Sequence, residues 1–132
     1  MILPESWTKR LLTLLVVLPG VLFTVMGVRW LVDPAGIAPT LGLNLESGLG
    51  LSSQIGDLAG FFLVAGLCIL LAVVTNRRTW YYPPIMLLSF AAIGRLVAWI
   101  VHDAAFAPQQ IGFEVVIAAI LLVASRYLPA RD

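Results

Sequence analysis

Charge is scarce in this sequence. Only 11% of its 132 residues are charged, whereas 61% are hydrophobic; soluble domains carry about 25% charged residues. Eight basic and seven acidic side chains cannot cover the surface of a water-soluble globule of this length. We therefore expect most of the surface to face lipid, and the length suits one transmembrane domain over residues 1–132.

Other residues and motifs that are scarce or absent exclude several classes of function. The one cysteine, Cys68, cannot form an internal disulfide. No basic run exceeds two residues and the net charge is +1, so we expect no nucleic-acid partner. The chain also lacks GxSxG, HExxH, Walker and CxxC motifs, and it holds one histidine. We therefore favour a protein without catalytic activity, and expect no cofactor and no metal.

Four apolar segments stand out against this background. They cover residues 11–32, 55–75, 82–101 and 108–125. Each is close to the ~20 residues that a helix needs to cross a ~30 Å hydrocarbon core. Lipid offers no partners to free backbone groups, so each span must be helical. The sequence thus predicts an all-α, integral membrane four-helix bundle.

The first span also has features of a secretory signal peptide, since Lys9 and Arg10 precede its apolar run. That run is longer than the ~7–15 residues of a signal-peptide core. Arg29 and Trp30 also interrupt the approach to a cleavage site near Gly36. We therefore expect a retained transmembrane helix.

Basic residues lie on one side of the predicted bundle. They precede the first span, join the second to the third, and follow the fourth, whereas the two opposite connections hold no lysine or arginine. Cytoplasmic loops are enriched in these residues, so both termini are predicted to be cytoplasmic. The long connection over residues 33–54 then lies outside; it either folds on the bundle or bilayer surface, or simply connects two helices.

Four charged side chains lie within the spans, at similar depth in the outer half. They are Arg29, Asp57, Arg95 and Glu114. Such residues are costly in lipid and usually face the bundle or a water-filled cavity. For Arg29 snorkelling to the surface is an equal alternative, and for Asp57 a favourable place in the helix dipole.

Arg95 and Glu114 lie too deep for either of these alternatives, at about 10 Å below the outer helix ends. They either form an ion pair that joins the third and fourth helices, or line a pocket. Trp99 and His102 follow Arg95 at i+4 and i+7 and share its helix face. The predicted polar cluster comprises Arg29, Asp57, Arg95, Trp99, His102 and Glu114.

The second span contains a GxxxG step, Gly56 and Gly60, which permits close packing between membrane helices. The two helical hairpins also resemble each other weakly. Each has an arginine late in its first helix and an acid early in its second. Since both hairpins start in the cytoplasm, a duplication would relate them as a parallel repeat about the membrane normal.

Short motifs along nearly the whole chain carry a family resemblance. They are Gly-Val-Arg-Trp-Leu-Val-Asp-Pro-Ala-Gly at 27–36, the Asp57-Leu-Ala-Gly60 start of the second span, Gly94-Arg95 and Glu114. Together they resemble a bacterial family of small four-helix membrane proteins of unknown function, DoxX-like in architecture. The resemblance implies a four-helix bundle in the bacterial inner membrane, and no particular activity.

Three functions fit these features. The first is binding of a lipid- or quinone-like molecule, with Arg95 as its polar partner, Glu114 and Asp57 as counter-charges and Trp99 as a wall. The second is an accessory subunit that packs on a membrane protein partner through the GxxxG face. The third is a small transporter or channel built as a homo-oligomer, which needs a polar path inward past Cys68; no span carries a charge in its inner half.

Overall fold

The computed structural model describes residues 5–130 and 132. Over these residues the chain is helical, without strands. Four helices are long and apolar enough to cross a membrane, as the sequence predicts: α1 (Glu5–Val32), α3 (Gly48–Thr75), α4 (Tyr82–Val101) and α5 (Pro108–Tyr127).

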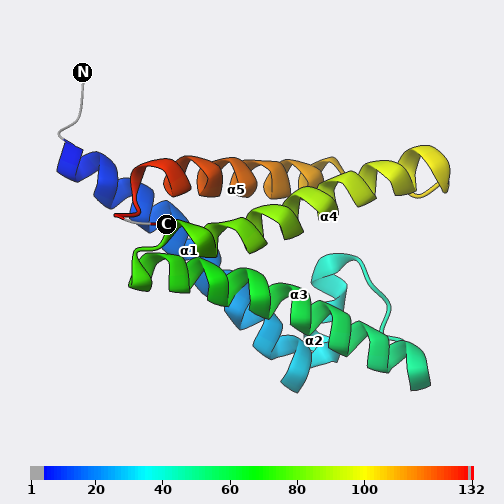
Figure 1. Ribbon diagram of the computed structural model, residues 1–132. Coiled ribbons are helices and arrows are strands. Elements are labelled where there is room, and N and C mark those ends of the chain that lie inside the picture. Colours follow the sequence, from blue (N-terminus) through cyan, green and yellow to red (C-terminus); the bar gives the residue numbers. More distant parts are fainter. Residues whose placement is uncertain (1–4, 131) are drawn as a thin grey trace.

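Three short helices occupy the connections: α2 (Pro34–Ile37), η1 (Ala38–Leu41) and η2 (Arg78–Tyr81). The long helices form two antiparallel hairpins, α1 with α3 and α4 with α5 (Figure 1). We call the end with the start of α1, the end of α5 and η2 the termini end, and the end with the α1–α3 and α4–α5 connections the loop end. The hairpins lie together at the termini end and diverge toward the loop end (Figure 1).

Helices α1 and α3 approach closely because glycines lie at their contact. A Cβ atom on Gly66 would lie 2.5 Å from the backbone nitrogen of Thr24 and 2.8 Å from the carbonyl oxygen of Gly20. One on Gly27 would lie 2.6 Å from Cγ of Leu63. Gly56 and Gly60 differ, since an added Cβ at either would meet nothing within 4 Å. The GxxxG step therefore makes no close contact within the described chain.

The core lies along the inner faces of the helices, where Phe23 links the two hairpins. Its ring centroid is 5.9 Å from that of Phe62 on α3 and 6.0 Å from that of Phe113 on α5. The outward faces expose long runs of leucine, valine and isoleucine, such as Leu14, Leu18 and Val25 on α1.

The connection after α1 folds back onto the bundle. Ile37 and Ala38 are almost completely buried, and Pro34 starts α2 where its missing N–H is not needed. Helix α3 begins at Gly48 instead of residue 55, because the start of an apolar run does not show where a helix begins. The non-helical part of the connection is correspondingly shorter. Gln54 ties it to α3 by accepting from the Glu46 amide and donating to the Asn44 carbonyl, both at 2.9 Å.

Candidate functional site

A large cleft lies where the hairpins diverge. Its volume is about 940 Å³, and residues of all four long helices line it. The lining is mainly apolar, with the aromatic rings of Phe23, Phe61, Phe90 and Phe113 prominent. Leu41 and Leu43, from the connection that folds back onto the bundle, also line it. The cleft is therefore an open hydrophobic space bordered by two hairpins and one loop.

Three polar residues line this cleft, namely Arg95, Gln110 and Glu114. Nε of Arg95 donates to Oε1 of Glu114 at 2.8 Å and links α4 to α5. The pair is unequally buried, since 39% of the Arg95 side chain is exposed but only 8% of that of Glu114. The carboxylate thus fixes one edge of the guanidinium group, while the rest of the group remains accessible.

The accessible part of Arg95 is unpaired. Its two terminal amino groups have no hydrogen-bond partner among the described residues. Ala91, Gly94 and Ala98 surround it on the cleft side of α4, and a Cβ on Gly94 would meet open space. Small neighbours therefore leave room for a ligand group beside the guanidinium group, which donates well to carbonyl, carboxylate or phosphate oxygens.

The cleft changes in character along its length. Arg95, Gln110 and Glu114 lie toward the loop end, whereas the α4 lining continues through Met86 to Pro83. From Arg95 to Pro83 the helix axis covers about 18 Å at 1.5 Å per residue. The polar groups are thus at one end, and a long stretch of apolar lining extends from them.

The other predicted cluster residues do not line this cleft. Nη2 of Arg29 lies 3.6 Å from Oδ2 of Asp33, one turn away, and 41% of the Arg29 side chain is exposed. Asp57 and His102 are exposed. The Trp99 ring packs on Phe106 at 4.5 Å between centroids. The structure therefore brings together Arg95 and Glu114 alone among the six predicted residues.

Gln110 was not among the predicted site residues. It precedes Glu114 by four positions, so both lie on one face of α5. This spacing alone could have identified it as a neighbour of a buried carboxylate. Within the part of the chain that the structure describes, no group of three or more His, Cys, Asp or Glu residues could hold a metal ion.

Comparison of the chain with protein-family models, with curated proteins and with solved structures finds no match. The fold and the site are those of a protein with four membrane-length helices and an apolar cleft between two hairpins.

Proposed function

We propose that the protein lies in the bacterial inner membrane, as a DoxX-like four-helix protein, and binds a lipid- or quinone-like amphipathic molecule without catalysis. The observation that carries the proposal is the change in polarity along the cleft, from Arg95 and Glu114 toward the loop end to an apolar lining that reaches Pro83. An amphipathic molecule has the same gradient.

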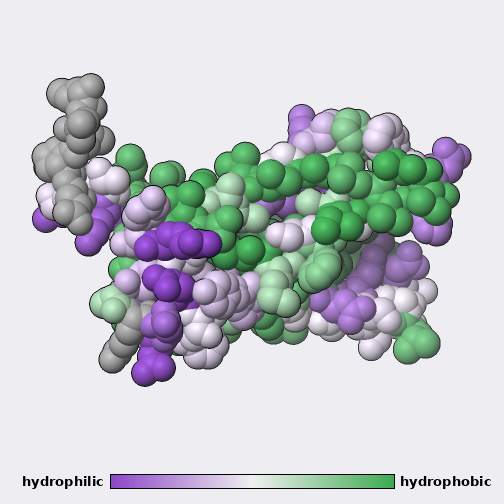
Figure 2. All heavy atoms as spheres, turned by 45° about the horizontal axis from the view of Figure 1, so that its top comes forward, coloured by the Kyte–Doolittle hydropathy of each residue, from purple (hydrophilic) through white to green (hydrophobic). Residues whose placement is uncertain are grey.

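The surface supports membrane insertion. On the face in Figure 2, hydrophilic residues gather toward the two ends and hydrophobic residues cover most of the length between them. Large apolar side chains are exposed along all four long helices, including Leu18, Val74, Ile100 and Val116. Such a surface is unfavourable in water and favourable in lipid. The basic residues of the termini end favour a cytoplasmic location for both chain ends.

Different residues hold the polar and the apolar part of the ligand. The amino groups of Arg95 donate to its carbonyl or anionic oxygens, and Glu114 keeps the guanidinium group in place. Gln110 offers an additional donor and acceptor at the same end. The tail lies along Phe61, Phe90 and Met86. The volume of about 940 Å³ matches the ~300–1,000 Å³ of small-molecule sites.

An accessory-subunit role is the alternative that a specific observation favours. The face of α3 around Gly56 and Gly60 is open, so a helix of a partner or of a second copy has room to approach it. A transporter or channel has less support, because past Arg95 toward the termini end the described lining of the cleft is apolar.

Native mass spectrometry of the gently solubilised protein tests the ligand proposal. Ala91→Phe fills the cleft beside Arg95, whereas Ala119→Phe adds the same bulk to an exposed position of α5 outside the cleft. We expect a defined small molecule to copurify with the wild type and with Ala119→Phe, and to be absent from Ala91→Phe. Arg95→Gln should also lose it.

A wild-type chain without any bound small molecule, or one bound only to another protein, contradicts ligand binding and favours the accessory role. Equal retention of the molecule by both phenylalanine variants would show that it is bulk lipid held on the outer surface.

A further inference from the structure

A second pocket lies at the termini end, far along α4 and α5 from the polar groups of the cleft. Its volume is about 490 Å³. Its lining differs from that of the cleft, because it combines two arginines and two tyrosines with a smaller share of apolar surface than the cleft has: Arg78, Arg126, Tyr82, Tyr127, Ser125 and Leu122. The residues that carry cationic and hydroxyl donors come from η2, α4 and α5.

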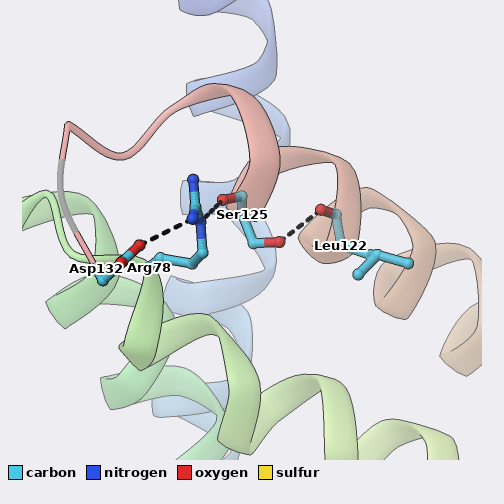
Figure 3. Close-up of polar contacts among 4 residues, drawn as sticks. All are labelled: Arg78, Leu122, Ser125 and Asp132. Atoms are coloured by element: carbon cyan, nitrogen blue, oxygen red, sulfur yellow. Dashed lines mark hydrogen bonds and ion pairs between the residues drawn. The ribbon is translucent and has the colours of Figure 1, made fainter.

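Arg78 is fixed in position at the C-terminal turn of α5 (Figure 3). Its Nε donates to the backbone carbonyl oxygen of Ser125 at 2.7 Å, and the Ser125 hydroxyl in turn donates to the Leu122 carbonyl oxygen at 2.6 Å. Only 34% of the Arg78 side chain is exposed. The Ser125 carbonyl thus fixes the guanidinium group through Nε, and an anion that binds the amino groups would leave this hydrogen bond intact.

A carboxylate already occupies the anion position on Arg78. Nη1 donates to Oδ1 of Asp132 at 2.8 Å (Figure 3), and the Asp132 side chain is 90% exposed. So exposed an ion pair contributes little to stability, which makes this carboxylate easy to displace. The pair shows that the geometry around Nη1 suits an anionic oxygen.

Arg126 supplies the unpaired positive charge. It lies in the last turn of α5, is exposed, and has no ion pair or hydrogen bond with any residue that the structure describes. Tyr82 and Tyr127 line the same pocket, and each carries a hydroxyl group that can donate. Two arginines and two hydroxyls around one space form a donor set for a tetrahedral oxyanion.

We propose that this pocket binds a phosphate group. A phospholipid headgroup and a free phosphate ion offer the same oxygens. The lipid has an additional partner, because Leu122 and the Tyr127 ring are exposed beside the arginines. Basic pockets between membrane helices on the cytoplasmic side are typical sites for anionic phospholipid headgroups. The site is independent of the ligand in the cleft.

The test uses the full chain in a neutral detergent, titrated with phosphatidylglycerol and followed by native mass spectrometry. Arg126→Gln removes the unpaired guanidinium group and no described contact, so folding should be unaffected. We expect binding to weaken about tenfold, as loss of a charge-assisted hydrogen bond implies. Arg77→Gln removes an equal charge from an exposed residue outside the pocket, and should change binding less than about twofold because of solvent screening.

A second variant and a second ligand complete the test. Asp132→Asn removes the competing carboxylate and should tighten binding of phosphatidylglycerol. Titration with inorganic phosphate, followed by calorimetry on the same variants, distinguishes the source of the phosphate group. Binding of either ligand that depends on Arg126 and not on Arg77 supports the site, and identifies lipid or free ion. Equal effects of Arg126→Gln and Arg77→Gln on both ligands, or no binding of either, would overturn it.

Discussion

At the scale of single residues, the Arg95–Glu114 pair combines both roles that the sequence left open. It joins α4 to α5 at 2.8 Å and it also lines the cleft. Bringing two charges out of water costs free energy that their attraction offsets only when the remaining donors and acceptors are satisfied. The amino groups of Arg95 have no partner among the described residues. An oxygen atom of a ligand would supply the missing hydrogen-bond acceptor.

Replacing either partner of this pair alone should destabilise the protein, and unequally. Arg95→Met leaves a carboxylate that is only 8% exposed without its cation; breaking buried pairs costs about 3–5 kcal/mol. Glu114→Leu leaves a guanidinium group that can still reach the open cleft, so we expect a smaller loss. The double variant should be more stable than Arg95→Met, because no unpaired charge remains. Unfolding in detergent with increasing denaturant measures the free energy of unfolding of each variant and so gives their order of stability.

A larger loss for Glu114→Leu than for Arg95→Met would contradict this account. It would show that the guanidinium group depends on Glu114 more than its exposure suggests.

Only part of the candidate site could be predicted from the amino-acid sequence. Charge depth identified Arg95 and Glu114, because an ionisable group deep inside a span is costly unless it pairs with another group or lines a cavity. The directions of Asp57 and Trp99 could not be predicted. Periodicity shows which residues of one helix share a face, but not how that helix is rotated against its neighbours. The apolar lining, such as Phe61, gives no signal distinct from lipid-facing residues.

At the scale of helices, the α1–α3 contact depends on the absence of side chains at three glycines. Gly66→Ala would place a methyl group against Thr24, including its backbone nitrogen at 2.5 Å, which cannot move without moving α1. We expect a loss of about 1–3 kcal/mol, as for overpacked cores. Thermal unfolding in detergent gives the measurement.

Gly60→Ala is the matched control, since its methyl group meets open space. When the protein is in detergent without a partner, Gly60→Ala should leave the free energy of unfolding unchanged or raise it by up to about 1 kcal/mol through helix propensity. Equal destabilisation by both changes would mean that the α1–α3 contact is not the tight one. A loss of stability confined to Gly60→Ala would reveal a partner helix on the GxxxG face.

The sequence predicted the four helices well but not where their tight contact lies. GxxxG spacing marked Gly56 and Gly60, whereas the close approach uses Gly20, Gly27 and Gly66, which are spread over two helices. A motif within one helix cannot show which of its faces meets another helix.

At the scale of the whole molecule, the divergence of the hairpins creates the cleft. At the termini end, Arg78 ties the α3–α4 connection to α5 through the Ser125 carbonyl. At the loop end, the corresponding connections belong to separate hairpins, and the segment with Leu41 and Leu43 lines the space between them. Apolar helices alone do not predict this divergence, because both a closed and a diverging bundle bury their inner faces.

The orientation of the molecule decides from which side of the membrane the polar end of the cleft is reached. With cytoplasmic termini, Arg95 is reached from the outer side. Single cysteines in a Cys68→Ser chain test this: Asn44→Cys at the loop end and Thr79→Cys at the termini end, both exposed. In intact spheroplasts, a membrane-impermeant maleimide should label only Asn44→Cys, and permeabilisation should expose Thr79→Cys. Labelling in the opposite order would place the polar end of the cleft on the cytoplasmic side, so that the ligand would come from the inner leaflet.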